Sequence, residues 1–461
     1  MQPDTSNPAP AGRRPIGLPE ILALSLALIS PTLVLSANGQ NLVRLTHVAP
    51  WKVYALGWIG VSAVGYSFGR LAGLGNGPGA AYLIVWQALG MRGGRITGMG
   101  LLGAYLSFAV ACPLASASFL IDLLHQAGGR TTAIPLMVMD MFVLAAGIVV
   151  MRGQTASIMR LLLGVEICGI VLIAFLALFI MMVAHGHDMS HPDVVQDHFG
   201  GLGFLSGIVV AFMSWAGFEA CMTLSDHHPR SDGMTRIALV GSIILSGVVF
   251  VGMMAVIQYG FESRLGGLSR LMTSSDVLAD LGRAYLGEWS AIAFGIMALG
   301  SSFAGGVAAL ITASRLSRDL VGSFHNDGVA CRHPLIERIL SPYGLTLIIA
   351  VGHWGLCLLA HVTQSIPSDG IGLYGLFGSV GAICIMTAYF WVQIAALVAF
   401  HKRMVSVSWW ENLIPLCGLL FIILTLGCCF LQAGSALTGL MIAGIWLLGG
   451  VLAATLSAGG P

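Results

Sequence analysis

Long apolar stretches recur through the whole chain, and they limit its possible folds more than any other feature. Most are about 20 residues long or longer, the length that an α-helix needs to cross a bilayer. Only 9% of the 461 residues are charged, too few to cover the surface of a soluble protein of this size. The sequence therefore predicts an all-α integral membrane protein with twelve transmembrane helices, near residues 17–42, 51–71, 95–124, 133–151, 156–184, 202–226, 234–259, 287–318, 342–361, 372–400, 408–430 and 434–457.

Positive charge alternates between the two ends of these stretches. If the N-terminus is cytoplasmic, 15 of the 21 Lys and Arg residues fall on the cytoplasmic side and 6 on the opposite side. Cytoplasmic loops of membrane proteins carry such an excess. We therefore expect a multi-pass protein of the bacterial inner membrane with both termini in the cytoplasm. The net charge of +1 argues against a nucleic-acid partner.

The connecting loops hold no pattern typical of an enzyme or a metal site. His185, His187, His191 and His198 share one outer loop, but their irregular spacing is typical of solvated side chains. The nine cysteines are scattered without a CxxC pair, and the chain has no HExxH or GxSxG motif. We expect no cofactor, no metal and no enzymatic activity. The segment 262–283, with mixed charge and spaced leucines, predicts short helices that form an extracellular lid.

The sixth stretch carries polar and helix-breaking residues at mid-membrane depth. It reads GFLSGIVVAFMSWAGFEACMTLSDHHPR from Gly203 to Arg230, with Ser214, Gly217 and Glu219 near its middle. A carboxylate at that depth costs roughly 2.5–3.5 kcal/mol on insertion scales. Glycine is a poor helix former, and freed backbone groups are tolerated in a membrane only where they face protein or a water-filled cavity. The segment is thus expected to be an interrupted helix that lines a central binding site.

The first stretch shows the same peculiarity. Its sequence ILALSLALISPTLVLSANG places Ser30, Pro31 and Thr32 in the middle, and a proline there removes a hydrogen-bond donor and opens the helix. Interrupted first and sixth helices are expected of a five-plus-five inverted repeat. We therefore expect three parts: a disordered tail (1–15), a transport core (16–400, with repeats near 16–185 and 200–400), and two additional helices (401–461).

Three segments, in order, resemble motifs of one family. GNGPGAAYLIVWQALGMRGGRITG (75–98) is similar to the GGaYvyv…lG…G loop of the amino acid–polyamine–organocation permeases, and GFEACMTLSDHHPR followed by RIALVGSI resembles their GFE–acidic–P–R–I–A pattern. ASRLSRDLVGSFHNDGVACRHP (313–334) is similar to their ASR…aRDG…P loop. At the first break the chain departs from the family, because Ser30–Pro31–Thr32 replaces the usual Gly-Ser-Gly.

The resemblance implies an alternating-access transporter in which a four-helix bundle rocks against the remaining helices. It also implies that a substrate carboxylate meets backbone amides at the first break, and that its ammonium meets carbonyls of both broken helices. Carried over to this chain, the substrate-binding residues are Ser30, Pro31, Thr32, Met213, Ser214, Trp215, Gly217 and Phe218. Trp215 and Phe218 flank the sixth break, where cation–π contact with the ammonium is one interpretation and helix packing the other.

Four other polar positions have two interpretations each. Glu219 either holds the broken helix together or contacts the substrate. Glu166, inside the fifth stretch, is the first candidate for a proton-coupling residue, because ionisable groups in membrane helices often belong to proton relays; the alternative is that it pairs with Arg160 near the cytoplasmic interface. Ser301 and Ser302 offer oxygen ligands for sodium, although helix packing explains them equally well. Asp140, in the fourth stretch, is a peripheral helper or faces another helix.

These features together predict a secondary active transporter of an amino acid or a related small amine, coupled to protons rather than to sodium. An amino acid exchanger or a polyamine carrier is the alternative within transport, but a polycation needs several acidic residues, and the stretches offer only Glu219, Glu166 and Asp140. A transporter-like membrane sensor is the alternative from another class, although the tails are too short for a signalling domain. The expected partners are a small substrate, protons or sodium, and the lipid bilayer.

Overall fold

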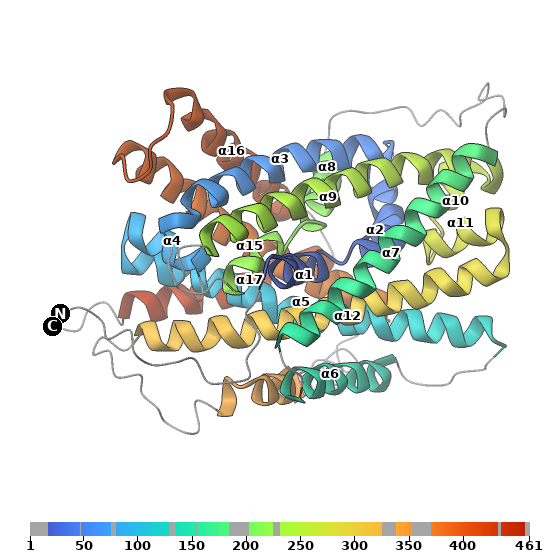
Figure 1. Ribbon diagram of the computed structural model, residues 1–461, viewed down its shortest axis with the longest axis horizontal. Coiled ribbons are helices and arrows are strands. Elements are labelled where there is room, and N and C mark those ends of the chain that lie inside the picture. Colours follow the sequence, from blue (N-terminus) through green and yellow to red (C-terminus); the bar gives the residue numbers. More distant parts are fainter. Residues whose placement is uncertain are drawn as a thin grey trace.

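Long helices run alongside one another and form a single bundle in the computed structural model (Figure 1). It describes residues 17–46, 48–74, 80–128, 135–152, 155–183, 202–224, 231–324, 338–349, 351–352, 370–431 and 435–456, among which there is no strand. The main helices are α1 (Leu18–Ile29), α2 (Pro31–Thr46), α3 (Pro50–Leu71), α5 (Met91–Gln126), α6 (Pro135–Arg152), α7 (Thr155–Val183), α8 (Leu202–Met213), α9 (Ser231–Gly260), α12 (Glu288–Phe324), α15 (Gly370–His401), α16 (Leu413–Leu431) and α17 (Ser435–Leu456). Shorter helical segments are η1 (Ala72–Leu74), α4 (Ala80–Leu89), η2 (Phe218–Leu224), η3 (Phe261–Leu265), α10 (Gly267–Leu271), α11 (Val277–Leu286) and η4 (Trp409–Asn412).

The helices coincide with the apolar stretches of the sequence. Nine helices in the described part of the chain are long and apolar enough to cross a membrane. The apolar part of α6 is shorter, and the stretch expected at 342–361 lies largely outside the described residues, so the count of twelve stays a prediction. The expected tail 1–15 and the four loop histidines also lie outside them.

Burial separates central helices from peripheral ones. Most residues of α1 and α2 are buried, and α5 packs along both α12 and α15. By contrast, α7 and α17 expose large apolar side chains such as Val171, Leu178 and Ile445. Such exposed residues are expected where a helix faces lipid rather than water. The broken first helix therefore lies at the centre of the bundle.

The first break forms at Ser30, between α1 and α2. A residue that precedes proline is disfavoured in the α-helical conformation, and Ser30 adopts a left-handed one with φ 49°. Pro31 has no N–H for the carbonyl of Ala27, so the Ser30 hydroxyl donates to that carbonyl instead, at 2.6 Å. Serine here takes the conformation that glycine usually supplies, at a cost of roughly 1–2 kcal/mol. The departure from the family motif thus preserves the break.

The second break lies between Met213, where α8 ends, and Phe218, where η2 begins. The N–H groups of Trp215, Ala216 and Phe218 donate to carbonyls three residues earlier, so the α-helical ladder is lost. Gly217 has φ 102°, which residues with a side chain rarely adopt. An added Cβ there would also collide with Leu28 of α1. Both predicted interruptions are therefore present.

The two breaks face each other. The Ser25 hydroxyl of α1 donates to the carbonyl of Phe218 at 2.7 Å and accepts from the N–H of Cys221 at 3.2 Å. In addition, α2 packs along α8. The freed backbone groups of one helix are thus partly satisfied by side chains of the other, as the membrane requires.

One helix was not expected from the sequence. Residues 75–98 were interpreted as a loop and turn that lead into the third span, but α4 forms within them. A Cβ added to Gly94 of α5 would lie 3.0 Å from the Cα of Trp86, so glycine permits α4 to fold back closely on α5. The sequence shows that the residues of α4 are apolar, but it does not show that α4 packs closely against α5.

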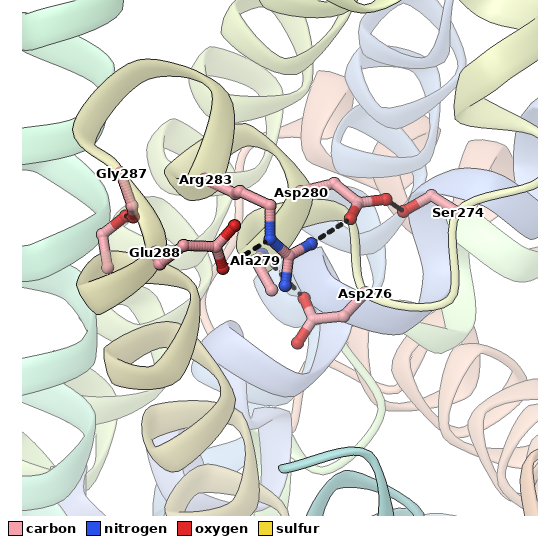
Figure 2. Close-up of polar contacts among 8 residues, drawn as sticks. Ser274, Asp276, Ala279, Asp280, Arg283, Gly287 and Glu288 are labelled. Carbon is pink, nitrogen blue, oxygen red and sulfur yellow. Dashed lines mark hydrogen bonds and ion pairs between the residues drawn. The ribbon is translucent and has the colours of Figure 1, made fainter. Parts of the chain in front are cut away.

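The segment 262–283 forms the expected short helices, which lie together at one end of the bundle (Figure 1). The Asp276 carboxylate accepts from the Ala279 N–H at 3.0 Å and so caps the N-terminus of α11. Asp280 accepts from Ser274 and pairs with Arg283, and Figure 2 shows these contacts around the first turns of α11. The helix α11 also packs against α2 and α12.

Asp276 makes the packing of α11 sensitive to pH. Burial raises the pKa of Asp276 from 3.8 to about 6, assisted by the nearby charges of Asp280 and Asp122 and opposed by the hydrogen bond from Ala279. The packed state therefore favours the protonated carboxyl, so its stability should fall as the pH rises from about 4 to about 6 and stay constant above that.

We expect hydrogen exchange of the α11 amides, corrected for the intrinsic effect of pH, to show higher protection at pH 4 than at pH 7. The variant Asp276→Asn should lose this difference, because asparagine caps a helix without titrating. Protection that rises with pH, or an equal pH effect in the variant, would contradict this assignment.

Candidate substrate site

A cavity of about 700 Å³ begins at the two breaks and opens at one end of the bundle. This size is typical of small-molecule sites, which range over roughly 300–1,000 Å³. Ser30 and Ala216 line it at the breaks, and Arg44, Leu45 and Gly203 line it at the end that the charge pattern predicts to be extracellular. The walls come from α1, α2, α5, α8 and α15.

The opposite end of the bundle is closed. Ser25 joins α1 to η2 there, and Arg160 at the start of α7 pairs with Glu20 of α1 at 2.7 Å. Glu20 in turn accepts from the N–H of Gly17 at 2.9 Å. The cavity is thus open at one end of the bundle and closed at the other.

Three of the predicted substrate-binding residues line the cavity, namely Ser30, Met213 and Ser214. Pro31, Thr32 and Gly217 shape the breaks but lie outside the lining. The direct roles assigned to all of these side chains stay predictions.

The two aromatic residues of the sixth break lie behind the cavity wall. Trp215 is fully buried, with its ring centroid 5.2 Å from that of Phe250 and 5.7 Å from that of Tyr54. Phe218 is also fully buried, 5.3 Å from Tyr389. In this conformation both rings pack against other helices, and their expected contact with a substrate stays a prediction.

A row of polar side chains lies along the cavity, and of its members only Ser214 was predicted from the sequence to bind substrate. The hydroxyls of Tyr54 and Ser214 are 2.8 Å apart, and Asn38 donates to Ser214 at 3.3 Å. Tyr374 in turn donates to Asn38 at 3.5 Å. Asn38 was visible as a polar residue in an apolar stretch, whereas nothing in the sequence distinguishes Tyr374 from a packing residue. This row links α3, the turn after α8, α2 and α15.

Glu219 is fully buried and does not line the cavity. Its carboxylate accepts hydrogen bonds from Tyr105 of α5, at 2.7 Å, and from Tyr389 of α15. It therefore ties η2 to the two helices that form the scaffold. This geometry agrees with the interpretation that Glu219 holds the broken helix.

Replacing Glu219 with leucine should destabilise the protein, because two buried hydroxyls lose their acceptor at roughly 1–3 kcal/mol each. Thermal unfolding of the detergent-solubilised protein measures the effect. The triple variant Glu219→Leu, Tyr105→Phe and Tyr389→Phe removes the stranded hydroxyls and should recover part of the loss. A single variant as stable as the unmodified protein would show that these bonds do not hold η2.

Glu166 is fully buried on α7, and both of its oxygens lie within hydrogen-bond distance of the Ser301 hydroxyl, at 2.9 and 3.1 Å. The alternative that it pairs with Arg160 is wrong, because Arg160 pairs with Glu20. The carbonyl of Ser301 accepts from the Ser30 hydroxyl at 3.1 Å. Glu166 is thus connected to the first break through a single residue of α12.

The remaining predicted residues, Ser301, Ser302 and Asp140, either bond to other protein groups or lie away from the cavity. Ser302 donates to the carbonyl of Leu299 at 2.9 Å and lies 2.8 Å from the Ser116 hydroxyl, while Ser301 is engaged by Glu166. Asp140 is buried on α6, away from the cavity lining. In the described residues no group of three or more His, Cys, Asp or Glu side chains is arranged to hold a metal ion.

A helical bundle with two facing broken helices at the base of a cavity is typical of multi-pass membrane transporters. A sequence model described as amino acid permease matches residues 17–452, so the chain belongs to the amino acid permease family. The sequence matches none of the curated proteins with which it was compared.

Solved structures support the same fold. A manganese transporter from Eremococcus coleocola, in complex with an aromatic bis-isothiourea-substituted compound, is 13% identical with a TM-score of 0.53, and the match covers 98% of each chain. A point mutant of that transporter is 12% identical with a TM-score of 0.55, and the match covers 97% of each chain. At this identity the likeness establishes the fold alone.

Proposed function

We propose that this protein is a secondary active transporter that moves an amino acid or a related small amine by alternating access, driven by protons. The observation that carries the proposal is the packing of two helix breaks against each other at the base of one cavity. Family membership supports transport, and the cavity supports a small substrate.

The breaks offer both kinds of group that an amino acid needs. The first N–H groups of α2 have no partner within their own helix, and a helix N-terminus attracts a carboxylate. Carbonyls at the end of α1 and in the turn after α8 suit an ammonium. Because Ser30 and Ala216 line the same cavity, one small zwitterion would reach both groups.

Proton coupling is assigned to Glu166. A change in its protonation alters its bond with Ser301, whose carbonyl holds Ser30 at the first break. The sodium alternative is less favoured, because the hydroxyls of Ser301 and Ser302 already have partners. Movement of the bundle formed by α1–α2, α3, α8–η2 and α9 would then carry the site from one side to the other.

We place both termini in the cytoplasm of a bacterium, with the cavity facing outward. The core would span 16–400, with repeats near 16–185 and 200–400, and α16 and α17 would be the additional helices.

Uptake of labelled amino acids and amines into proteoliposomes tests the proposal. We expect accumulation when the outside is more acidic than the lumen, and only equilibration without a gradient. The same assay with a sodium gradient should give no accumulation. If no amino acid or amine is accumulated or exchanged under any gradient, the protein does not have the proposed function.

A further inference from the structure

We infer that the substrate is a neutral, zwitterionic amino acid with a large apolar side chain, rather than a polyamine or a cationic or acidic amino acid. The inference rests on the proposed function and concerns the selectivity of the same cavity. Three observations carry it: the charge of the lining, the position of Arg44, and the composition of the wall beside the breaks.

No carboxylate is available to a cationic side chain. Among the described residues that line the cavity there is no Asp or Glu. The membrane carboxylates Glu219 and Glu166 lie outside the lining and are engaged by hydroxyl groups. A second ammonium, as in lysine or a polyamine, would therefore lose water in the cavity without gaining an anionic partner, and that loss is severe for a charged group.

Among the described lining residues Arg44 is the only cation, and it lies too far from the breaks to select an acidic side chain. Arg44 is thirteen residues beyond Pro31 on α2, which corresponds to about 20 Å at 1.5 Å per residue. Its side chain is exposed at the mouth, where its Nε donates to the carbonyl of Met272 beside α10. A glutamate bound at the breaks would not reach it.

The wall beside the breaks is apolar and has room. Phe108 of α5, Met213 of α8 and Ile383 of α15 line the cavity together with Gly378. The nearest atom to a Cβ built on Gly378 is the Met213 methyl, at 3.7 Å, so the glycine leaves space next to a flexible thioether. The neutral groups of Asn38 and Ser214 close the other side. These surroundings suit the side chain of leucine, methionine or phenylalanine.

Competition against uptake of a labelled substrate tests the inference. In proteoliposomes with a pH gradient, leucine and phenylalanine should inhibit at least about tenfold more strongly than alanine, the discrimination that a hydrophobic pocket gives for one or more methylenes. Lysine, putrescine and glutamate should inhibit less than alanine. Each compound is also tested as a labelled substrate.

Two substitutions in the apolar wall test whether its free space sets the preference for large side chains. Gly378→Ile fills the space and should reduce the preference for phenylalanine over alanine by about tenfold, whereas Met213→Ala enlarges it and should keep or increase that preference. Gly252→Val, on the lipid-facing side of α9 where an added Cβ meets nothing, is the control and should not change the ratio.

The outcomes are distinguishable. Transport of lysine, putrescine or glutamate as efficient as that of leucine would overturn the selectivity inference but leave the transporter intact. A ratio that Gly378→Ile does not change would also overturn it. If none of the compounds is transported, the proposed function fails, and the inference fails with it.

Discussion

Replacing Glu166 with glutamine is expected to abolish proton-driven accumulation while leaving exchange of substrate across the membrane. Glutamine keeps the size of glutamate and can still accept a bond from Ser301, but it has no proton to release. A gradient of two pH units drives about 100-fold accumulation for one proton per substrate, since each tenfold ratio corresponds to about 1.4 kcal/mol. The variant should reach only a ratio of about 1, measured by uptake into proteoliposomes.

Counterflow and a surface carboxylate provide the controls. Exchange of labelled for unlabelled substrate should persist in Glu166→Gln, because it requires no net proton movement. Glu288→Gln changes a carboxylate whose side chain is 76% exposed and should accumulate substrate normally. If Glu166→Gln accumulates substrate as well as the unmodified protein does, coupling resides elsewhere.

Replacing Gly217 with valine is expected to reduce transport strongly, including exchange. Valine would have to adopt φ 102°, at a cost of roughly 1–3 kcal/mol, and its side chain would collide with Leu28. The sixth helix would then lose its turn or move away from α1, and either change separates the two halves of the site. A loss of at least about tenfold in the exchange rate is expected, equivalent to about 1.4 kcal/mol.

Gly252→Val serves as the matched control for that substitution too. It makes the same chemical change in α9, where an added Cβ meets nothing within 4 Å. Thermal unfolding of both variants separates loss of folding from loss of function. A Gly217→Val protein that exchanges substrate normally would show that the second break is not required.

The positions of the breaks were predictable because each depends on local chemistry. Pro31 removes a donor and restricts Ser30, and Gly217 permits a left-handed turn, whatever surrounds them. The apolar stretches were equally visible, because each helix must be nearly continuous in its hydrophobicity to cross the membrane. The all-helical membrane class could therefore be predicted without knowing how the helices pack.

The partners of the buried polar groups were not predictable. Glu166 and Ser301 are 135 residues apart in sequence, and Glu219 meets Tyr389 170 residues later. Such pairs depend on how helices pack, and a tyrosine in an apolar stretch has the same appearance whether it binds a carboxylate or fills space. The same limit explains why Tyr374 was missed, although it lines the cavity.

The central claim, that the facing breaks form a site with alternating access, is tested most directly by chemical labelling at position 38. Asn38 lines the cavity, and the variant Asn38→Cys, in a chain whose nine native cysteines are replaced, would report its accessibility to a membrane-impermeant maleimide. The account predicts labelling from the extracellular side that slows when a transported amino acid is bound. Labelling that is unaffected by substrate, or absent from that side, would contradict it.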